Sequence, residues 1–121
     1  MICLAPRDEI RKTSPEYHAA LARGVPWRQV EFPITDHGVP DDRIAFRALA
    51  KDTASALRTG ERILIHCGAG VGRTGTLAVA VLLGLDQALS DALKIVKAAE
   101  SGPETEGQRE ILEWIAASGP M

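Results

Sequence analysis

The sequence predicts an α/β fold, in which a central, mainly parallel β-sheet is flanked by α-helices in three layers. Three apolar runs have the character of strands, at residues 1–5, 27–34 and 62–66. Segments with helical caps and helical spacing lie between and after these runs. Strands that alternate with helices usually pair in parallel through right-handed crossovers. With 121 residues, no repeats and no linker, we expect a single domain over residues 1–121.

Five helices are expected from their capping and breaking residues. Serine and aspartate accept hydrogen bonds at helix starts, proline fits the first turn, and glycine fits the C-terminus. Residues 73–83 are apolar almost all round, so they should form a buried central helix. The expected helices begin at Ser14, at Asp41 or Asp42, at Arg73, at Ser90 and at Glu106, and the first two end at Gly24 and Gly60.

One decapeptide combines a nucleophile, an anion-binding loop and a cation: His66-Cys67-Gly68-Ala69-Gly70-Val71-Gly72-Arg73-Thr74-Gly75. It joins the third strand to the central helix, so Cys67 would lie at the positive end of a helix dipole. Helix N-termini and nearby cations lower the pKa of cysteine from about 8.5 to about 3.5–7.5. Alternating glycines let backbone N–H groups approach an anion closely. Arg73 adds a planar fork that can hold two phosphate oxygens.

This segment resembles the signature loop of the cysteine-dependent protein tyrosine phosphatases, in which His-Cys precedes five residues, arginine, and serine or threonine. The resemblance implies that Cys67 attacks phosphorus and that Arg73 binds the phosphate in the ground and transition states. It also implies that Thr74 donates a hydrogen bond to the sulfur and that His66 orients the loop. The backbone that would bind phosphate comprises Gly68, Ala69, Gly70, Val71 and Gly72. A small buried cysteine in a glycine-rich turn is the simpler alternative.

A second motif fits a general acid, which would protonate the leaving group and typically accelerates such reactions about 10²–10⁴-fold. Residues 31–40 read Glu-Phe-Pro-Ile-Thr-Asp-His-Gly-Val-Pro, which places Asp36 on a loop after a strand. Active sites of open α/β sheets collect there. The segment is similar to the family's acid loop, although aspartate is also a common turn residue. Asp41 and Asp42 are rival acids or helix caps, and His37 is either a leaving-group contact or a surface residue.

Two further residues have two interpretations each. Gln108 ends a Glu-Thr-x-x-Gln pattern, which in compact members of the family implies a residue that positions the hydrolytic water. Thr105 and Gln108 also fit a capping box. Cys3 could form a reversible disulfide with Cys67 if the sheet brings their Cα atoms within about 7 Å. A buried strand residue is the simpler interpretation of Cys3.

The N-terminal part departs from the family pattern. Family members usually carry a segment with one or two further strands before the strand that matches residues 1–5. With the family's strand order, the strand that leads to Cys67 becomes a sheet edge, and a bare apolar edge invites pairing with another chain. We therefore expect one of four cases: a homodimer that covers this edge, a domain-swapped form, a minimal variant that protects the edge in its own way, or a fragment. Residues 7–9 should form a solvated loop or supply an acid that supports Arg73.

The loop interior contains no lysine or further arginine, which resembles the tyrosine and dual-specificity types. The implied activity is hydrolysis of phosphotyrosine in proteins, with phosphoserine and phosphothreonine left open, through a phosphocysteine. Inositol polyphosphates, other small phosphorylated substrates, a non-catalytic phospho-ligand-binding module and a redox or sulfur-transfer role are alternatives. The presence of Cys67, Arg73 and Asp36 together favours the enzyme.

Composition narrows the class of protein. The formal net charge of −2 does not suggest a nucleic-acid partner, and no apolar stretch approaches the roughly 20 residues of a membrane span. Two cysteines make no disulfide framework, and no signal peptide is evident, so we expect a cytoplasmic protein. Abundant arginine and alanine indicate a bacterial source. No cofactor or metal is expected, because Arg73 and the loop backbone would take the metal's place.

Overall fold

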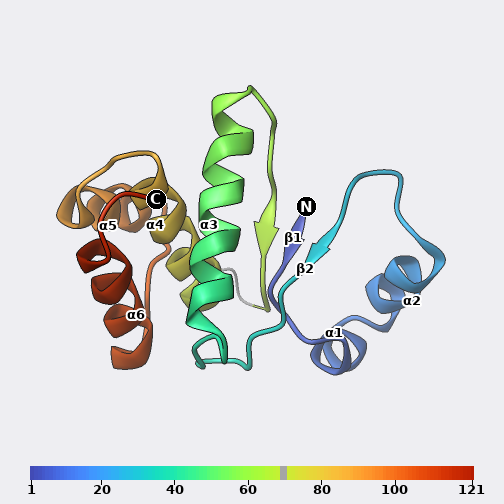
Figure 1. Cartoon of the computed structure of the whole chain (residues 1–121). Helices are drawn as coiled ribbons and strands as arrows, with labels where there is room; N and C mark the ends of the chain where they lie inside the picture. Colours follow the sequence, from blue (N-terminus) through green and yellow to red (C-terminus); the bar gives the residue numbers. More distant parts are fainter. Residues whose placement is uncertain (69–70) are drawn as a thin grey trace.

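The computed structural model describes residues 1–68 and 71–121 (Figure 1). Within these ranges, helices surround a three-stranded parallel sheet, which confirms the predicted α/β class. The elements in chain order are β1 (Ile2–Cys3), α1 (Arg7–Thr13), α2 (Pro15–Arg23), β2 (Val30–Glu31), α3 (Arg43–Arg58), β3 (Ile65–His66), α4 (Gly72–Gly84), α5 (Leu89–Ala98) and α6 (Glu106–Ala117).

The sheet has the strand order β2-β1-β3, and both pairs of strands are parallel. Ile2 lies opposite Val30 on one side and Ile65 on the other. The strands are shorter than the predicted runs, but single hydrogen bonds continue the pairing, as from the Ile34 amide to the Leu4 carbonyl at 2.8 Å. In the described part of the chain, β3 is an edge strand, as predicted, and the homodimer that would cover it stays a prediction.

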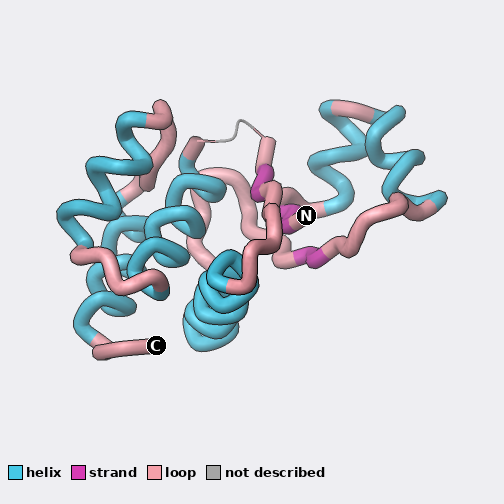
Figure 2. Tube along the Cα trace, turned by 90° about the horizontal axis from the view of Figure 1, so that it is seen from above, coloured by secondary structure: helices cyan, strands magenta, loops and turns pink. Residues whose placement is uncertain are grey.

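The two faces of β1 pack against different helices because side chains alternate along a strand. Ile2 and Leu4 face the large core that α3, α4, α5 and α6 build, and Cys3 and Ala5 face α1 and α2. Figure 2 shows these two groups of helices on opposite sides of the strands. Cys67 packs against the large core, so Cys3 lies on the other face of the sheet, and both thiols are free. Cys3 is therefore a buried strand residue, and its burial raises the pKa of its thiol.

Helix α4 is the centre of the large core, as its apolar sequence predicts. Leu77, Val79 and Ala80 are fully buried, and α3, α5 and α6 pack around them. One side of α4 is closely approached by the backbone after α5, because a Cβ atom added to Gly75 would lie 2.1 Å from the Gly102 nitrogen. Glycine at position 75 therefore lets this backbone segment reach the N-terminal part of α4.

Local signals at most helix starts are confirmed. The Ser14 hydroxyl accepts a hydrogen bond from the Tyr17 amide, and the Asp42 carboxylate accepts one from the Ala45 amide at 3.0 Å. Asp42 is thus the cap of α3, which leaves Asp41 as an exposed residue before it. Gly24 follows α2 with a positive φ of 93°.

Two expectations about helices are wrong. Residues 7–9 were expected in a loop, but they begin α1, where Asp8 and Glu9 in the first turn suit the helix dipole. Ile10 is the one buried residue of α1, so the sequence has no apolar stripe that predicts this helix. Helix α5 begins at Leu89 after an extended Ala88, so Ser90 lies inside the first turn and does not cap it.

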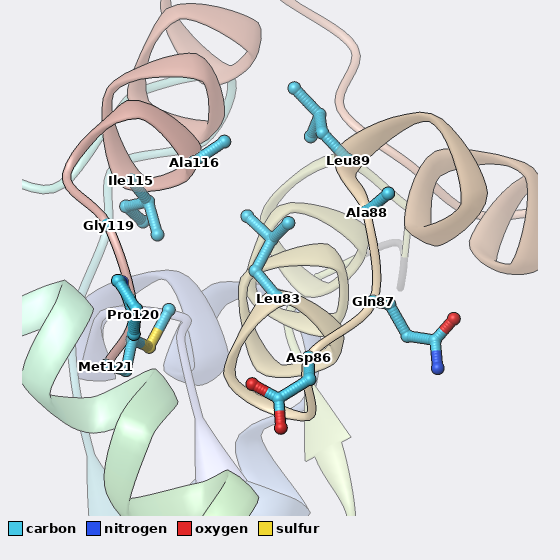
Figure 3. Close-up of a pocket in the computed structure, with 10 residues that line it drawn as sticks. All are labelled: Leu83, Asp86, Gln87, Ala88, Leu89, Ile115, Ala116, Gly119, Pro120 and Met121. Atoms are coloured by element: carbon cyan, nitrogen blue, oxygen red, sulfur yellow. The ribbon is translucent and has the colours of Figure 1, made fainter.

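A cavity of about 420 Å³ lies at the far end of α4, between the α4–α5 turn and the end of α6 (Figure 3). Its lining is largely apolar and includes Leu83, Leu89 and Ile115. At 1.5 Å per residue, α4 separates this cavity from Gly72 by about 18 Å. No helix in residues 1–68 or 71–121 has the length and apolar character needed to cross a membrane.

The contact between Gly75 and Gly102 predicts the effect of a single methyl group. We expect Gly75→Ala to lower the free energy of unfolding by about 1–3 kcal/mol, because overpacking against backbone cannot relax cheaply. Gly107→Ala is the matched control, since its Cβ would meet only the end of the Val39 side chain, at 3.1 Å. The control should stay within about 1 kcal/mol of the unchanged protein. Urea denaturation measures both variants, and equal stability would contradict the packing described for α4.

Candidate active site

The nucleophile candidate lies at the junction of β3 and α4. Cys67 follows the last residue of β3, and α4 begins at Gly72, which places the half-buried thiol before a helix N-terminus. The Thr74 hydroxyl donates a hydrogen bond to the Cys67 sulfur, with the oxygen 2.9 Å from the sulfur. The structure therefore contains the contact predicted for stabilising a thiolate. Two predicted phosphate-binding residues, Ala69 and Gly70, lie outside the described residues.

The Arg73 guanidinium is held by a carboxylate from the other side of the sheet. Its side chain is 2% exposed, and Nη1 and Nη2 donate to the two Glu9 carboxylate oxygens at 3.1 and 2.9 Å. Nη1 also donates to the Ile34 carbonyl at 2.8 Å. Burial by itself lowers the pKa of Arg73, but the hydrogen bonds and charge of Glu9 outweigh it and raise this pKa above its usual value. The guanidinium is therefore a fixed cation.

The fixed orientation of Arg73 leaves part of its fork for a ligand. A guanidinium has five N–H donors, and three of them serve Glu9 and Ile34. Among the described residues, Nε and one N–H of Nη2 make no hydrogen bond, although the Asp36 carboxyl group lies 3.4 Å from Nη2. These two donors have the side-by-side arrangement that binds two oxygens of a phosphate. Arg73 can thus keep its ion pair with Glu9 while it binds an anion.

The predicted general acid joins the same group. Asp36 lies 3.4 Å from Arg73 Nη2 through its Oδ1 atom, although its side chain is 61% exposed. His37 has a positive φ of 61° and places its Nε2 atom 3.7 Å from the other Asp36 oxygen. The structure thus brings Asp36 and Arg73 together, and it leaves His37 on the surface beside the acid.

Gln108 connects α6 to the loop that carries Asp36. Its side chain is buried, and its amide oxygen accepts hydrogen bonds from the backbone N–H groups of Glu104 and Thr105. Its amide nitrogen donates to the Gly38 carbonyl at 3.1 Å. With the Thr105 hydroxyl on the Gln108 amide, these contacts confirm the capping box. The predicted role of Gln108 toward water stays a prediction.

His66 is held from the α2 side of the sheet. Its Nε2 atom lies 2.9 Å from the Tyr17 hydroxyl oxygen, and the two rings contact each other with centroids 5.6 Å apart. Burial, with a smaller contribution from the charged N-terminus, lowers the pKa of His66 below the usual value of 6.5. A neutral imidazole beside the loop suits an orienting role better than a cationic one.

Two residues that support the site are not evident from the sequence: Glu9, which pairs with Arg73, and Tyr17, which contacts His66. Glu9 is 64 residues from Arg73 along the chain, and its segment fits a solvated loop as well as an acid that supports Arg73. Tyr17 contacts His66 from a helix whose sequence shows no ligand spacing. Acidic residues in the first turn of a helix after β1 were the available signal for Glu9. Among the described residues, no cluster of three His, Cys, Asp or Glu side chains could hold a metal ion.

Comparison with known proteins identifies this arrangement. The family model described as PTP-SAK, "Swiss Army Knife protein, DSP-PTPase phosphatase domain", matches residues 9–111. The chain belongs to this phosphatase family. The family membership agrees with the resemblance inferred from the decapeptide, and the match extends from Glu9 to Ile111.

Curated relatives are tyrosine phosphatases of greater length. The putative tyrosine phosphatase 197R of Invertebrate iridescent virus 6 is 31% identical over 94 residues, which are 75% of this chain and 35% of the viral protein. The receptor-type tyrosine-protein phosphatase eta of Mus musculus is 49% identical over 55 residues, which are 42% of this chain and 4% of the receptor. The chain therefore spans a small part of these phosphatases.

Solved phosphatase structures have the same fold. The kinase associated phosphatase, with its catalytic cysteine replaced by serine, superposes with a TM-score of 0.80 at 21% identity over 97% of this chain and 67% of that one. Tk-PTP in its active form superposes with a TM-score of 0.70 at 25% identity over 96% of this chain and 76% of that one. The α/β architecture is thus that of the phosphatase family.

The Arg73–Glu9 pair predicts a measurable loss of stability. We expect Glu9→Gln to lower the free energy of unfolding by about 1–3 kcal/mol, because the buried guanidinium would keep hydrogen bonds but lose its compensating charge. Asp8→Asn removes the same charge from the exposed neighbouring residue and should have little effect. Chemical denaturation of both variants measures the difference, and equal stabilities would argue against the ion pair.

The lowered pKa of His66 predicts how acid affects the protein. Above pH 6.5 the imidazole is neutral in both the folded and the unfolded state, so it contributes no pH dependence. Below this value the unfolded state binds the proton first. The free energy of unfolding therefore decreases as the pH is lowered, until the folded form is also protonated. NMR titration of the ring protons should give a midpoint below 6.5, and a midpoint at or above 6.5 contradicts the burial of His66. His66→Gln should flatten the fall in melting temperature with pH.

Proposed function

We propose that this chain hydrolyses phosphate monoesters of tyrosine side chains in proteins through a phosphocysteine intermediate. The observation that supports this best is the convergence of a thiol, a fixed guanidinium and an exposed carboxyl group at the N-terminal end of α4. Asp36 comes from a part of the chain distant from Cys67 and Arg73, and a redox role for the cysteine would not need it. Phosphoserine and phosphothreonine are further substrates to test, since family members include dual-specificity enzymes.

The first step would transfer the phosphoryl group to sulfur. The Cys67 thiolate attacks phosphorus, the P–S bond forms, and the P–O bond to the substrate breaks. The leaving oxygen takes its proton from Asp36, which avoids expulsion of a free phenoxide. Arg73 binds two phosphoryl oxygens through the N–H groups that Glu9 leaves open. The backbone N–H groups of the signature loop complete the cradle, as the family resemblance implies.

The second step would return the enzyme to its resting state. Water attacks the phosphocysteine and passes one proton to the Asp36 carboxylate left ionised by the first step, a new P–O bond forms, and the P–S bond breaks with its electron pair on sulfur. The Thr74 hydroxyl, 2.9 Å from the Cys67 sulfur, stabilises the departing thiolate by its hydrogen bond. Inorganic phosphate then leaves. Both steps use side chains, the loop backbone and one water molecule, and Arg73 supplies the positive charge.

Turnover of p-nitrophenyl phosphate with EDTA present tests this function. We expect Cys67→Ser to abolish turnover and Asp36→Ala to lower kcat by about 10²-fold, because it removes a general acid. Asp41→Ala is the matched control, since Asp41 is exposed and lies five residues after Asp36 without contact to Arg73. The control should turn over like the unchanged protein. Undiminished turnover in Cys67→Ser, or no turnover in the folded unchanged protein, would overturn the proposal.

A further inference from the structure

The carbonyl group of Val71 accepts two hydrogen bonds at the start of α4. Val71 is the N-cap of this helix, and the Gly75 amide donates to its carbonyl oxygen at 2.7 Å, which is the first backbone bond of the helix. The Ser101 hydroxyl donates to the same oxygen at 2.9 Å. Ser101 lies 30 residues further along the chain and follows α5. Its hydrogen bond is therefore a tertiary contact with the signature loop.

These two bonds fix the direction of the next amide group. In a planar trans peptide unit, the C=O of one residue and the N–H of the following residue point in opposite directions. The Val71 C=O points along α4 toward Gly75, so the Gly72 N–H points out of the N-terminal end of the helix. The first N–H groups of a helix have no acceptor within it, and they bind anions readily. The Gly72 N–H is therefore aimed at the place where the signature loop would bind phosphate.

The backbone that carries Ser101 is itself held in place. Helix α5 ends in a Schellman motif, in which the Ser101 amide donates to the Val96 carbonyl at 3.1 Å. The second bond of the motif joins the Glu100 amide to the Lys97 carbonyl at 2.9 Å, and Glu100 has the left-handed conformation that the motif needs, with a φ of 61°. On the other side of Ser101, the backbone of Gly102 packs directly on α4. The Ser101 hydroxyl is thus presented to the loop by a rigid turn.

The peptide group between Val71 and Gly72 has a second orientation that would oppose phosphate binding. If this group turned over, the Gly72 N–H would point away from the site, and the negative end of the carbonyl dipole would face the phosphate. The turn rotates ψ of Val71 and φ of Gly72, and glycine accepts either sign of φ at little cost. With Ser101 present, the turn breaks two hydrogen bonds of the carbonyl oxygen, whereas without its hydroxyl the turn breaks one.

We propose that Ser101 is a positioning residue for phosphate binding, which keeps the Gly72 N–H directed at the anion through the carbonyl of Val71. The inference rests on the proposed function for the identity of the ligand. Ser101 acts through the peptide group, and it takes no part in the transfer of the proton or of the phosphoryl group. Removal of its hydroxyl lets the loop populate the turned peptide. The apparent affinity for phosphate then falls with the fraction of molecules that keep the binding orientation.

Titration of the protein with inorganic phosphate, followed by amide NMR, tests this role without turnover. We expect Ser101→Ala to weaken phosphate binding by about 3–10-fold, which is the range that one net hydrogen bond supplies. Phosphate should move the Gly72 amide proton downfield in the unchanged protein, and by less in the variant. Ser101→Thr and Ser101→Val have the same shape and differ in the hydroxyl, so the threonine variant should bind phosphate more tightly than the valine variant.

The matched control is Ser118→Ala, because the Ser118 hydroxyl also donates to a backbone carbonyl, that of Trp114 at 2.6 Å, at the end of α6. This variant should bind phosphate like the unchanged protein. Equal phosphate affinity with and without the Ser101 hydroxyl overturns the inference while the proposed function stands. A weaker affinity with an undiminished shift of the Gly72 amide also overturns it.

The same titration separates this inference from the proposed function. If the unchanged protein binds phosphate but does not turn over p-nitrophenyl phosphate, the proposed hydrolysis fails and the role of Ser101 in anion binding stands. If the unchanged protein binds no phosphate, both fail.

Discussion

The buried pair of Arg73 and Glu9 is the interaction on which the site depends. A guanidinium that is 2% exposed needs a compensating charge and hydrogen-bond acceptors, because an unpaired buried cation is strongly unfavourable. The carboxylate comes from α1 and a further acceptor, the Ile34 carbonyl, comes from the chain after β2. One side chain of α4 therefore joins this helix to two other segments, α1 and the chain after β2. The fold therefore fixes the orientation of Arg73 before any ligand binds.

The same pair explains a glycine in the signature loop. A Cβ atom at position 68 would lie 3.0 Å from both Arg73 Nη2 and Glu9 Oε2, so the backbone passes directly over the ion pair. At position 72 the reason for glycine is different, since a side chain there would displace the Glu104 carboxylate. The loop glycines thus serve contacts with particular neighbours, as well as the close approach to phosphate that their pattern suggests. A substitution at Gly68 would disturb the cation before it disturbed any ligand.

The sequence predicts those parts of the site that neighbouring residues determine. Cys67, Arg73 and Thr74 lie within one strand–loop–helix unit, and the Asp36 loop carries its own turn residues, so local patterns suffice for them. Glu9 depends on topology, because the parallel pairing of β1 with β3 brings its carboxylate to the Arg73 guanidinium. Helix α1 buries Ile10 and little else, so its sequence has no apolar stripe from which a helix could be predicted. Local sequence cannot report which element lies across the sheet.

The charges around Arg73 argue that geometry, more than net charge, would hold a phosphate here. Glu9 and Asp36 both face the guanidinium, and Glu104 adds a third carboxyl group at the loop, so carboxyl groups outnumber the cation. An incoming phosphate dianion would then depend on donors that point at it: the two open N–H groups of Arg73, the loop backbone and the positive end of α4. Such directional donors also suit a transition state, in which charge shifts between oxygens whose positions the donors already fix. A site built in this way can keep a carboxyl group such as Asp36 beside the phosphate in spite of its charge.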